Sequence, residues 1–262
     1  MTDPWTVVVG VKQVPDEDDV SIDPDTGTLD RADAAAILNR PDRNALEAAL
    51  RLKDEVDARV IAMTMGPPMA TPALETAVAM GCDDAVLVTD RAFGGSDTWP
   101  TSLALAETAE YLGADVVVCG EETTDSSTGQ VPPGIAAHND WAQLTYVEEL
   151  DPLPDDEQLA ARRDVEGGYE RVVADLPVVV AVAYGENDPR PAGLHRKIYA
   201  ETEFDPVELS ADDLGIDEDT VGLAASPTQV GGMETVDPVA RERERVETPS
   251  ELVDELADAG EI

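Results

Sequence analysis

The sequence predicts a doubly wound α/β fold with a mainly parallel sheet, and three observations support this prediction. Short runs of β-branched residues alternate with longer segments whose apolar residues recur at helical spacing. The β-branched runs are apolar almost throughout, as expected for strands that helices cover on both faces. Glycine, proline and aspartate gather in the breaks between these segments. Together these features indicate parallel strands joined by right-handed helical crossovers.

Five runs are predicted to be strands of this sheet. They share a β-branched, apolar character and lie at Trp5–Lys12, Arg59–Met65, Ala85–Val88, Asp115–Cys119 and Pro177–Tyr184. The stretch "EGGYERVVADLPVVV" has two glycines before an alternating segment, so it predicts a hairpin insertion that returns to the sheet.

Three amphipathic segments, at residues 41–56, 69–81 and 98–113, are predicted to be helices between the strands. Pro41 suits the first turn of a helix, Thr98 suits an N-cap, and Gly81 suits a C-cap. A weaker amphipathic pattern after Pro249–Ser250 predicts one more helix near the C-terminus.

Residues 1–184 are predicted to form an α/β domain, and residues 185–262 an extended C-terminal arm. The chain beyond Gly185 is acidic, interrupted by proline and short of apolar runs. An arm that cannot bury itself is expected to pack on another chain, and partial disorder is the alternative.

The charge of the chain is strongly negative. It has 57 Asp and Glu residues against 17 Lys and Arg residues, for a formal net charge of −40, yet 42% of the residues are hydrophobic. We interpret this as a halophilic surface, because at about 1 M salt the Debye length falls to about 3 Å and self-repulsion is screened. Nucleic-acid binding is not expected, since no basic stripe is available to neutralise phosphates.

The chain shows no leader pattern and no apolar run near the roughly 20 residues that span a bilayer. A cytoplasmic protein without membrane insertion is therefore expected. Cys82 and Cys119 lie among apolar residues and are expected to pack as small hydrophobes. No metal site is predicted, and His138 and His195 have no nucleophile context, so no catalytic residue is assigned.

Four loops follow the predicted strands at their carboxyl ends, where open α/β sheets bind ligands. They are Gly10–Asp16, Met65–Pro68, Thr89–Trp99 and Gly120–Gln130. The last loop is too long for a simple turn, so it is either a loose surface connection or a cradle. Its main-chain amides, together with hydroxyls at Thr123, Thr124, Ser126, Ser127 and Thr128, suit a phosphate at the start of the following helix.

Motifs at these same loops resemble the beta subunit of electron transfer flavoprotein. The matching stretches include "VVGVKQVPD", "LNRPDRNALEAALRLKDE", "MTMGPP", "DRAFGGSDTWPTS", "DVVVCGEETTDSSTGQV", "NDPRPAGL" and the terminal "LVDELADAGEI". They occur in order across nearly the whole chain. The resemblance implies a Rossmann-like fold of the adenine-nucleotide-binding type.

The resemblance also implies a heterodimer with an alpha subunit that holds FAD, and a nucleotide pocket in this chain. The implied cofactor-binding residues are Gly10, Asn39, Arg40, Pro41, Asp42, Met65, Asp90, Arg91, Ala92, Phe93, Thr98, Gly120, Thr123, Thr124, Asp125, Ser126, Ser127, Thr128, Gly129, Gln130 and Val131. The long polar loop would then wrap the phosphates of a nucleotide, and no side chain need act as acid, base or nucleophile.

The nucleotide implied by the resemblance is either AMP, as in simple members, or FAD, as in the bifurcating and nitrogen-fixation-associated branch. "KQVPD", "MGPP" and "DRAFGGSDTWPTS" resemble that second branch, in which NADH can reduce the extra flavin. Glu121 and Glu122 depart from the family pattern, and carboxylates beside a pyrophosphate are unfavourable. The carboxylates count against FAD, whereas the three branch motifs favour it. FAD is preferred on the motifs, with AMP as the alternative.

Two further residues are assigned to partner docking by the resemblance. Leu194, in "NDPRPAGL", matches the leucine with which family members touch acyl-CoA dehydrogenases, and Asp164 matches an acid facing the alpha subunit. Dehydrogenases or quinone reductases are the implied partners, with a membrane or ferredoxin-type acceptor. The alternatives are a stand-alone, stress-type protein that binds adenosine nucleotides without redox chemistry, and a purely structural subunit.

Overall fold

The structure is a computed structural model of the chain, and it describes residues 4–16, 21–22, 29–30, 36–185, 187–229, 245–246 and 248–260. The chain divides into two compact units, Met1–Gln229 and Val230–Ile262. The first unit contains the sheet and its helices. The second contains helix α7 (Pro249–Asp258), where a helix was predicted from the Pro249–Ser250 start.

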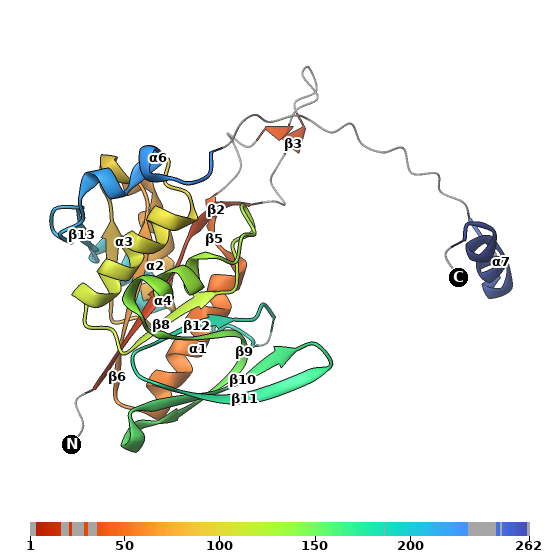
Figure 1. Cartoon of the computed structure of the whole chain (residues 1–262), viewed down its shortest axis with the longest axis horizontal. Coiled ribbons are helices and arrows are strands. Elements are labelled where there is room, and N and C mark those ends of the chain that lie inside the picture. Colours follow the sequence, from red (N-terminus) through yellow and green to blue (C-terminus); the bar gives the residue numbers. More distant parts are fainter. Residues whose placement is uncertain are drawn as a thin grey trace. The chain divides into compact units, whose positions relative to one another are not determined.

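A nine-stranded sheet forms the centre of the first unit (Figure 1). In chain order its strands are β1 (Trp5–Gly10), β6 (Ala58–Met65), β7 (Asp84–Val88), β8 (Val116–Gly120), β9 (Ala142–Leu153), β10 (Gln158–Val165), β11 (Gly168–Asp175), β12 (Val178–Val182) and β13 (Val207–Leu209). Their order in space is β11-β10-β9-β12-β8-β1-β6-β7-β13. Along the spatial order β9-β12-β8-β1-β6-β7-β13, every neighbouring pair is parallel. Strands β10 and β11 pair antiparallel at the β9 edge.

The predicted doubly wound α/β fold is confirmed. Each of the five predicted strands is present with both ends within two residues of the prediction. The stretch predicted to form a hairpin, residues 166–180, holds the turn and second strand of the β10–β11 hairpin and then the start of β12, which does not pair with β11. Valines of β1 lie opposite valines of β8 and the apolar middle of β6. These central strands are covered on both faces, which is why they read as unbroken apolar runs.

The helices between the strands are α1 (Arg40–Glu55), α2 (Thr71–Met80), α3 (Thr98–Tyr111) and α4 (Val131–Asn139). Helices α1 and α2 share one core with one face of the sheet, whereas α3 and α4 cover the other face (Figure 1). Gly81 caps α2 as predicted, and its N–H donates to the carbonyls of Ala77 and Val78. The predicted cap at Thr98 is wrong, because Asp97 is the residue whose carboxylate accepts the N–H of Trp99.

Among the described residues, the first unit also contains short elements. They are the antiparallel pairs β2 (Gln13–Pro15) with β5 (Ala36–Leu38) and β3 (Ser21–Ile22) with β4 (Leu29–Asp30), four 3-10 turns η2 (Pro68–Ala70), η3 (Arg91–Phe93), η4 (Pro154–Asp156) and η5 (Glu218–Thr220), and helix α6 (Gly222–Ala225). None of these elements was predicted, because each is too short to show a periodic pattern of apolar residues.

Much of the chain beyond Gly185 packs on the sheet unit. Helix α5 (Leu194–Thr202) lies on α2, and β13 pairs with β7. Leu209, Ala211 and Leu214 enter the core. The division between compact units at Gln229 therefore does not coincide with the predicted boundary at residues 184–185. Residues 230–244 of the predicted arm lie outside the described residues.

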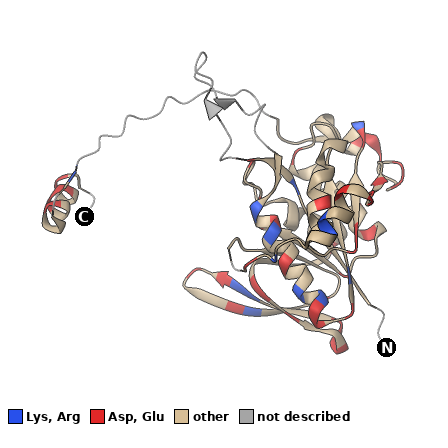
Figure 2. Ribbon diagram, turned by 180° about the vertical axis from the view of Figure 1, so that it is seen from behind, with Lys and Arg blue, Asp and Glu red and all other residues tan. Residues whose placement is uncertain are grey.

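Acidic residues are numerous outside the central strands of the sheet. Asp and Glu residues are spread over helices, loops and strand ends, with fewer Lys and Arg residues among them (Figure 2). Cys82 and Cys119 are buried and free, which confirms that they pack as small hydrophobes. None of the helices in the described part of the chain has the length and apolar character needed to span a bilayer.

Candidate functional site

The candidate site lies where two loops leave adjacent parallel strands. Strand β1 lies between β6 and β8. The chain passes from β1 to β6 on one side and later enters β8 on the other, so the strand order reverses between β1 and β8. In open α/β sheets ligands bind beyond the carboxyl ends of the strands at such a reversal. The loops concerned begin after Gly10 and Gly120.

The two glycines allow close packing at these strand ends. A Cβ atom at Gly120 would lie 2.6 Å from Asp42 Oδ1 and 2.8 Å from the carbonyl carbon of Pro41. A Cβ atom at Gly10 would lie 2.9 Å from the Sγ of Cys119. Because these distances exclude a side chain, the start of α1 can press directly against the end of β8.

Asn39, just before α1, connects that helix to the polar loop. Its side chain is buried and does not cap its own helix. Instead Nδ2 donates to the carbonyl of Glu122 at 3.0 Å, and Oδ1 accepts the N–H of Thr124 at 3.1 Å. The amide therefore satisfies a donor and an acceptor of the loop together, which fixes the path of its first residues.

Asp42, in the first turn of α1, is buried and connects the same helix to the loop after β1. Its Oδ2 accepts the main-chain N–H of Lys12 at 2.8 Å. Burial raises the pKa of the Asp42 carboxyl to about 7, although hydrogen bonds from Asn39, Lys12 and Gly120 partly oppose this. The start of α1 thus holds both loops that meet at the strand-order reversal.

Residues 120–130, which we call the polar loop, form a compact turn around Thr123. The Thr123 carbonyl accepts the N–H groups of Ser126 and Ser127 at 3.3 and 2.7 Å. Its hydroxyl donates to Asp125 Oδ1 at 2.7 Å and lies 2.8 Å from Ser126 Oγ. Ser127 adopts a φ of 45°, in the left-handed region. The polar loop is therefore held by its own hydrogen bonds.

Several main-chain donors of the polar loop are available to a ligand. Within the described residues, no acceptor is bonded to the N–H groups of Asp125, Thr128 or Gly129. The residues from 125 to 130 are exposed, and α4 begins directly afterwards at Val131. Free N–H groups that precede a helix N-terminus form a favourable environment for a phosphate.

Lys12 brings a positive charge to this edge of the sheet. Its Nζ lies 2.9 and 2.7 Å from the two carboxylate oxygens of Asp125. Burial alone would raise the pKa of Asp125, but hydrogen bonds from Lys12, Thr123 and Ser126 outweigh it and lower that pKa. The ion pair therefore links the loop after β1 with the polar loop.

The loop after β7 approaches the polar loop through Thr98. The Thr98 hydroxyl donates to Gln130 Oε1 at 3.1 Å. Upstream, Asp90 accepts the N–H of Ala92 at 3.0 Å and that of Ala211 at 3.3 Å. Phe93 packs in the core with 6% of its surface exposed. The segment from Asp90 to Phe93 is thus tied to residues near β13.

The structure brings some of the sequence-predicted residues together and leaves others apart. Gly10, residues 39–42, Thr98 and the polar loop are joined by the contacts above. Met65 ends β6 on the far side of β1, and Arg91 and Ala92 make no polar contact to the polar loop among the described residues. Leu194 begins α5 and Asp164 lies in β10, both away from the strand-order reversal.

Lys12 was missed as a site residue by the sequence-based assignment. Its signal is that it lies two residues beyond the carboxyl end of β1, in a chain with only three lysines. No group of three or more His, Cys, Asp or Glu side chains in the described ranges is arranged to hold a metal ion. The site therefore offers main-chain donors, hydroxyls and one ammonium group.

Comparison with known proteins adds to this geometry. Residues 26–208 match the family described as "Electron transfer flavoprotein domain". An "Electron transfer flavoprotein subunit beta" from Clostridium acetobutylicum is 44% identical over 224 residues, which cover 86% of this chain and 85% of the relative.

Two other relatives carry different names. The "Caffeyl-CoA reductase-Etf complex subunit CarD" of Acetobacterium woodii is 41% identical over 227 residues, covering 86% of this chain and 85% of the relative. "Protein FixA" of Azotobacter vinelandii is 38% identical over 261 residues, covering 96% of this chain and 92% of the relative. The similarity therefore extends over most of each protein.

Proposed function

The chain belongs to the electron transfer flavoprotein family as a homologue of its beta subunits, and we propose that it binds an adenine nucleotide between the loops that follow β1 and β8. The observation that carries this proposal is the polar loop, whose free N–H groups at Asp125, Thr128 and Gly129 precede α4 beside the Lys12 ammonium. Such donors suit the phosphates of a nucleotide.

The residues of this chain bind and orient the nucleotide. Asn39 and Asp42 hold the polar loop and the loop after β1 in place, and Lys12 supplies positive charge beside carboxylates. The redox chemistry is that of a flavin, which the protein positions and tunes. No side chain of this chain acts as acid, base or nucleophile in the proposal.

FAD is the proposed nucleotide in this chain, and AMP is the alternative. The similarity to the Caffeyl-CoA reductase-Etf complex subunit and to FixA favours the branch with FAD. The negative charge of Glu121 is a weaker argument against FAD than the sequence alone suggests. Its Oε1 accepts the N–H of Tyr184 at 3.2 Å, so its carboxylate is engaged by the loop after β12.

The flavin content of the complex tests this choice. The full chain is co-expressed with its alpha subunit, and the nucleotides are extracted and quantified. Two FAD molecules per heterodimer are expected. One FAD and one AMP would select the alternative, and one FAD with no second nucleotide would contradict the proposed site.

The proposed partner is an electron transfer flavoprotein alpha subunit, with dehydrogenases or quinone reductases as redox partners. Leu194 is 74% exposed at the start of α5, and Asp164 is exposed in β10, so both are accessible to other chains. In α7, Leu252 and Val253 are 46% and 52% exposed, which suits packing of the C-terminal arm on the alpha subunit. Co-purification with a tagged alpha subunit tests the heterodimer, and a monomer in gel filtration would contradict it.

The acidic surface is proposed to be an adaptation of a cytoplasmic protein to high salt. With a net charge of −40, repulsion between surface carboxylates is strong in dilute buffer and screened at molar salt. The melting temperature of the full chain is therefore expected to rise from dilute buffer to 2 M KCl. An equal melting temperature in both would contradict this.

A further inference from the structure

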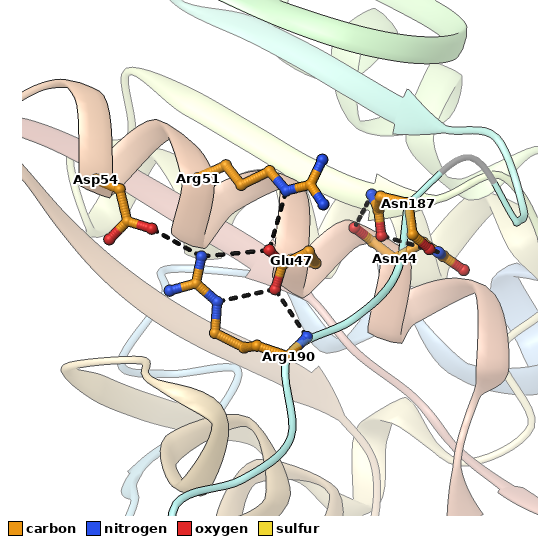
Figure 3. Close-up of polar contacts among 6 residues, drawn as sticks. All are labelled: Asn44, Glu47, Arg51, Asp54, Asn187 and Arg190. Atoms are coloured by element: carbon orange, nitrogen blue, oxygen red, sulfur yellow. Dashed lines mark hydrogen bonds and ion pairs between the residues drawn. The ribbon is translucent and has the colours of Figure 1, made fainter.

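Glu47 and Arg190 join two parts of the chain that lie 143 residues apart in sequence. Glu47 is in the middle of α1, and its side chain is 6% exposed. Arg190 Nε donates to Glu47 Oε2 at 2.8 Å, and Nη2 donates to Oε1 at 3.3 Å (Figure 3). The main-chain N–H of Arg190 also donates to Oε2, at 2.9 Å. One carboxylate therefore fixes both the side chain and the backbone at this position.

Asn44 and Asn187 add a second contact on the same face of α1. Asn44 is buried, and its Nδ2 donates to the carbonyl of Asn187 at 2.8 Å. Asn187 Nδ2 returns a bond to the carbonyl of Asn44 at 3.1 Å (Figure 3). Because Asn44 and Glu47 are three residues apart, they are neighbours on the helix surface. Residues 187–190 thus follow about one turn of α1.

The Glu47–Arg190 ion pair is buried enough for its loss to matter. Burial raises the pKa of Glu47, but hydrogen bonds from Arg190 and Arg51 outweigh it and hold that pKa below its ordinary value. Hydrogen bonds to Glu47 and Asp54 raise the pKa of Arg190. Both groups are therefore charged at neutral pH. Removing the arginine would leave a buried carboxylate without its main partner, which is strongly unfavourable.

Arg51 contacts the same carboxylate but plays a different role. Its Nε donates to Glu47 Oε1 at 3.0 Å from one turn away on α1, and its side chain is 52% exposed. This hydrogen bond joins two residues of α1 and reaches no other segment of the chain. Arg51 is therefore a matched control for Arg190, because its loss removes a cation from Glu47 without releasing a distant segment.

The segment that follows this contact presents apolar side chains to solvent. Leu194 and Ile198 lie one turn apart on α5 and are 74% and 50% exposed. On the inner side of α5, Ala200 is buried, and Arg196 Nε donates to the carbonyl of Val78 at 3.0 Å, near the end of α2. Helix α5 is thus fixed on α2, and its entry depends on residues 187–193.

We propose that Arg190 is a positioning residue that holds this entry on α1, so that the exposed surface of Leu194 and Ile198 meets an acyl-CoA dehydrogenase in one conformation. The inference rests on the proposed function, in which Leu194 contacts a dehydrogenase. A surface that is ordered beforehand loses less conformational entropy on binding. Loss of the Arg190 contact therefore weakens docking and leaves electron transfer within the docked complex unchanged.

An ion pair with a buried carboxylate also suits a protein with this charge, although the Arg190 side chain is 33% exposed. Exposed pairs lose their attraction when salt shortens the Debye length, whereas buried pairs are screened much less. Glu47 is buried, so its contact with Arg190 is expected to persist in molar KCl.

The first measurement is amide hydrogen exchange at position 190 in the full chain bound to its alpha subunit, because the N–H of Arg190 is the main-chain donor that is hydrogen-bonded among the described residues 187–193. Arg190→Ala is expected to accelerate exchange there by about tenfold or more, because a buried pair is broken. Arg51→Ala is expected to leave it unchanged. Arg190→Lys keeps the charge but loses the two-pronged contact, so it should give an intermediate rate and remains informative if Arg190→Ala does not fold.

The second measurement is electron transfer with an acyl-CoA dehydrogenase from the same organism as the probe. Arg190→Ala should raise the dehydrogenase concentration at half-maximal rate several-fold. The maximal rate, and the rate with a small dye that needs no docking surface, should not change. Arg51→Ala should match the wild type in all three.

Unchanged exchange in Arg190→Ala, or equal acceleration in Arg51→Ala, would overturn the positioning role. Leu194→Ala separates this role from the proposed function, because it should raise the half-maximal concentration without altering amide exchange at position 190. If Leu194→Ala raises that concentration and Arg190→Ala does not, the positioning role is wrong. If neither variant raises it, the docking assignment itself fails.

Discussion

The ammonium group of Lys12 lies 2.9 and 2.7 Å from the carboxylate oxygens of Asp125, and this ion pair joins the loops that leave β1 and β8. The two side chains are 43% and 28% exposed, so the pair itself contributes little to stability. Its importance is local, because the same polar loop carries Glu121 and Glu122. In the proposed nucleotide site, Lys12 would offset the charge of a phosphate among these acids.

Replacing Lys12 with alanine is expected to weaken AMP binding by about tenfold or more, since a hydrogen bond to a charged group contributes about 1.5–3 kcal/mol. Titration calorimetry of AMP into the nucleotide-depleted full chain measures this. Lys53→Ala is the control, because Lys53 pairs with Asp83 at the opposite end of α1. Equal losses in both variants would argue against a role for Lys12 at the site.

Asn39→Ala is expected to lower the free energy of unfolding by about 1–3 kcal/mol, because Glu122 and Thr124 each lose a buried partner. It should also reduce the nucleotide that co-purifies with the complex, since the polar loop loses its attachment to α1. Asn139→Ala provides the comparison, because Asn139 bonds the carbonyl of Ala106 from the far end of α4. A full nucleotide content in Asn39→Ala would contradict the proposed site.

Gly120→Ala is expected to destabilise the chain by about 1–3 kcal/mol, because the new methyl group would lie 2.6 Å from Asp42 Oδ1 and 2.8 Å from Pro41. Urea unfolding measures this. Gly168→Ala is the matched control, since a Cβ atom at Gly168 meets nothing within 4 Å. The same small effect at both positions would show that α1 can move away from β8.

The stability of the chain is expected to carry a pH dependence from Asp42. Its pKa is about 7 in the folded chain against an ordinary 3.8, so between about pH 4 and pH 7 the folded state binds a proton that the unfolded state lacks. The contribution of this group therefore falls as pH rises through that window and is constant above it. The Asp42→Asn variant has no such group and lacks this loss. The free energy of unfolding of the variant minus that of the wild type should therefore increase by about 2–3 kcal/mol from pH 5 to pH 8.

This comparison is best made in 2 M KCl, where the repulsion among other carboxylates is screened. Asp155→Asn, at an exposed position in η4, controls for the loss of one acid. Parallel pH profiles for wild type and Asp42→Asn would show that Asp42 is ionised throughout.

The central strands and the first three crossover helices were predictable because local pattern encodes them. Valine-rich runs such as β1 and β12 are buried on both faces, and α1 shows an apolar stripe between Pro41 and Val56. The cap at Asp97 was missed because Thr98, directly beside it, is also a residue type that caps helices. Only the structure shows which side chain accepts the N–H of Trp99.

Contacts between distant residues were not predictable from the sequence. Lys12 and Asp125 are 113 residues apart, and Glu47 and Arg190 are 143 apart, so neither pair leaves a periodic signal. Strand β13 was missed for a related reason. It has three residues in an acidic segment, and it becomes a strand because the edge of β7 is available to pair with it.

The position of β13 limits how the segment around α5 can move. The chain leaves the sheet after β12 and returns to it at β13, where the N–H of Thr89 also donates to the carbonyl of Leu209. Helix α5 therefore belongs to a strap that is closed at both ends by main-chain hydrogen bonds. Detaching this segment from the sheet therefore requires the edge strand β13 to lose its pairing with β7.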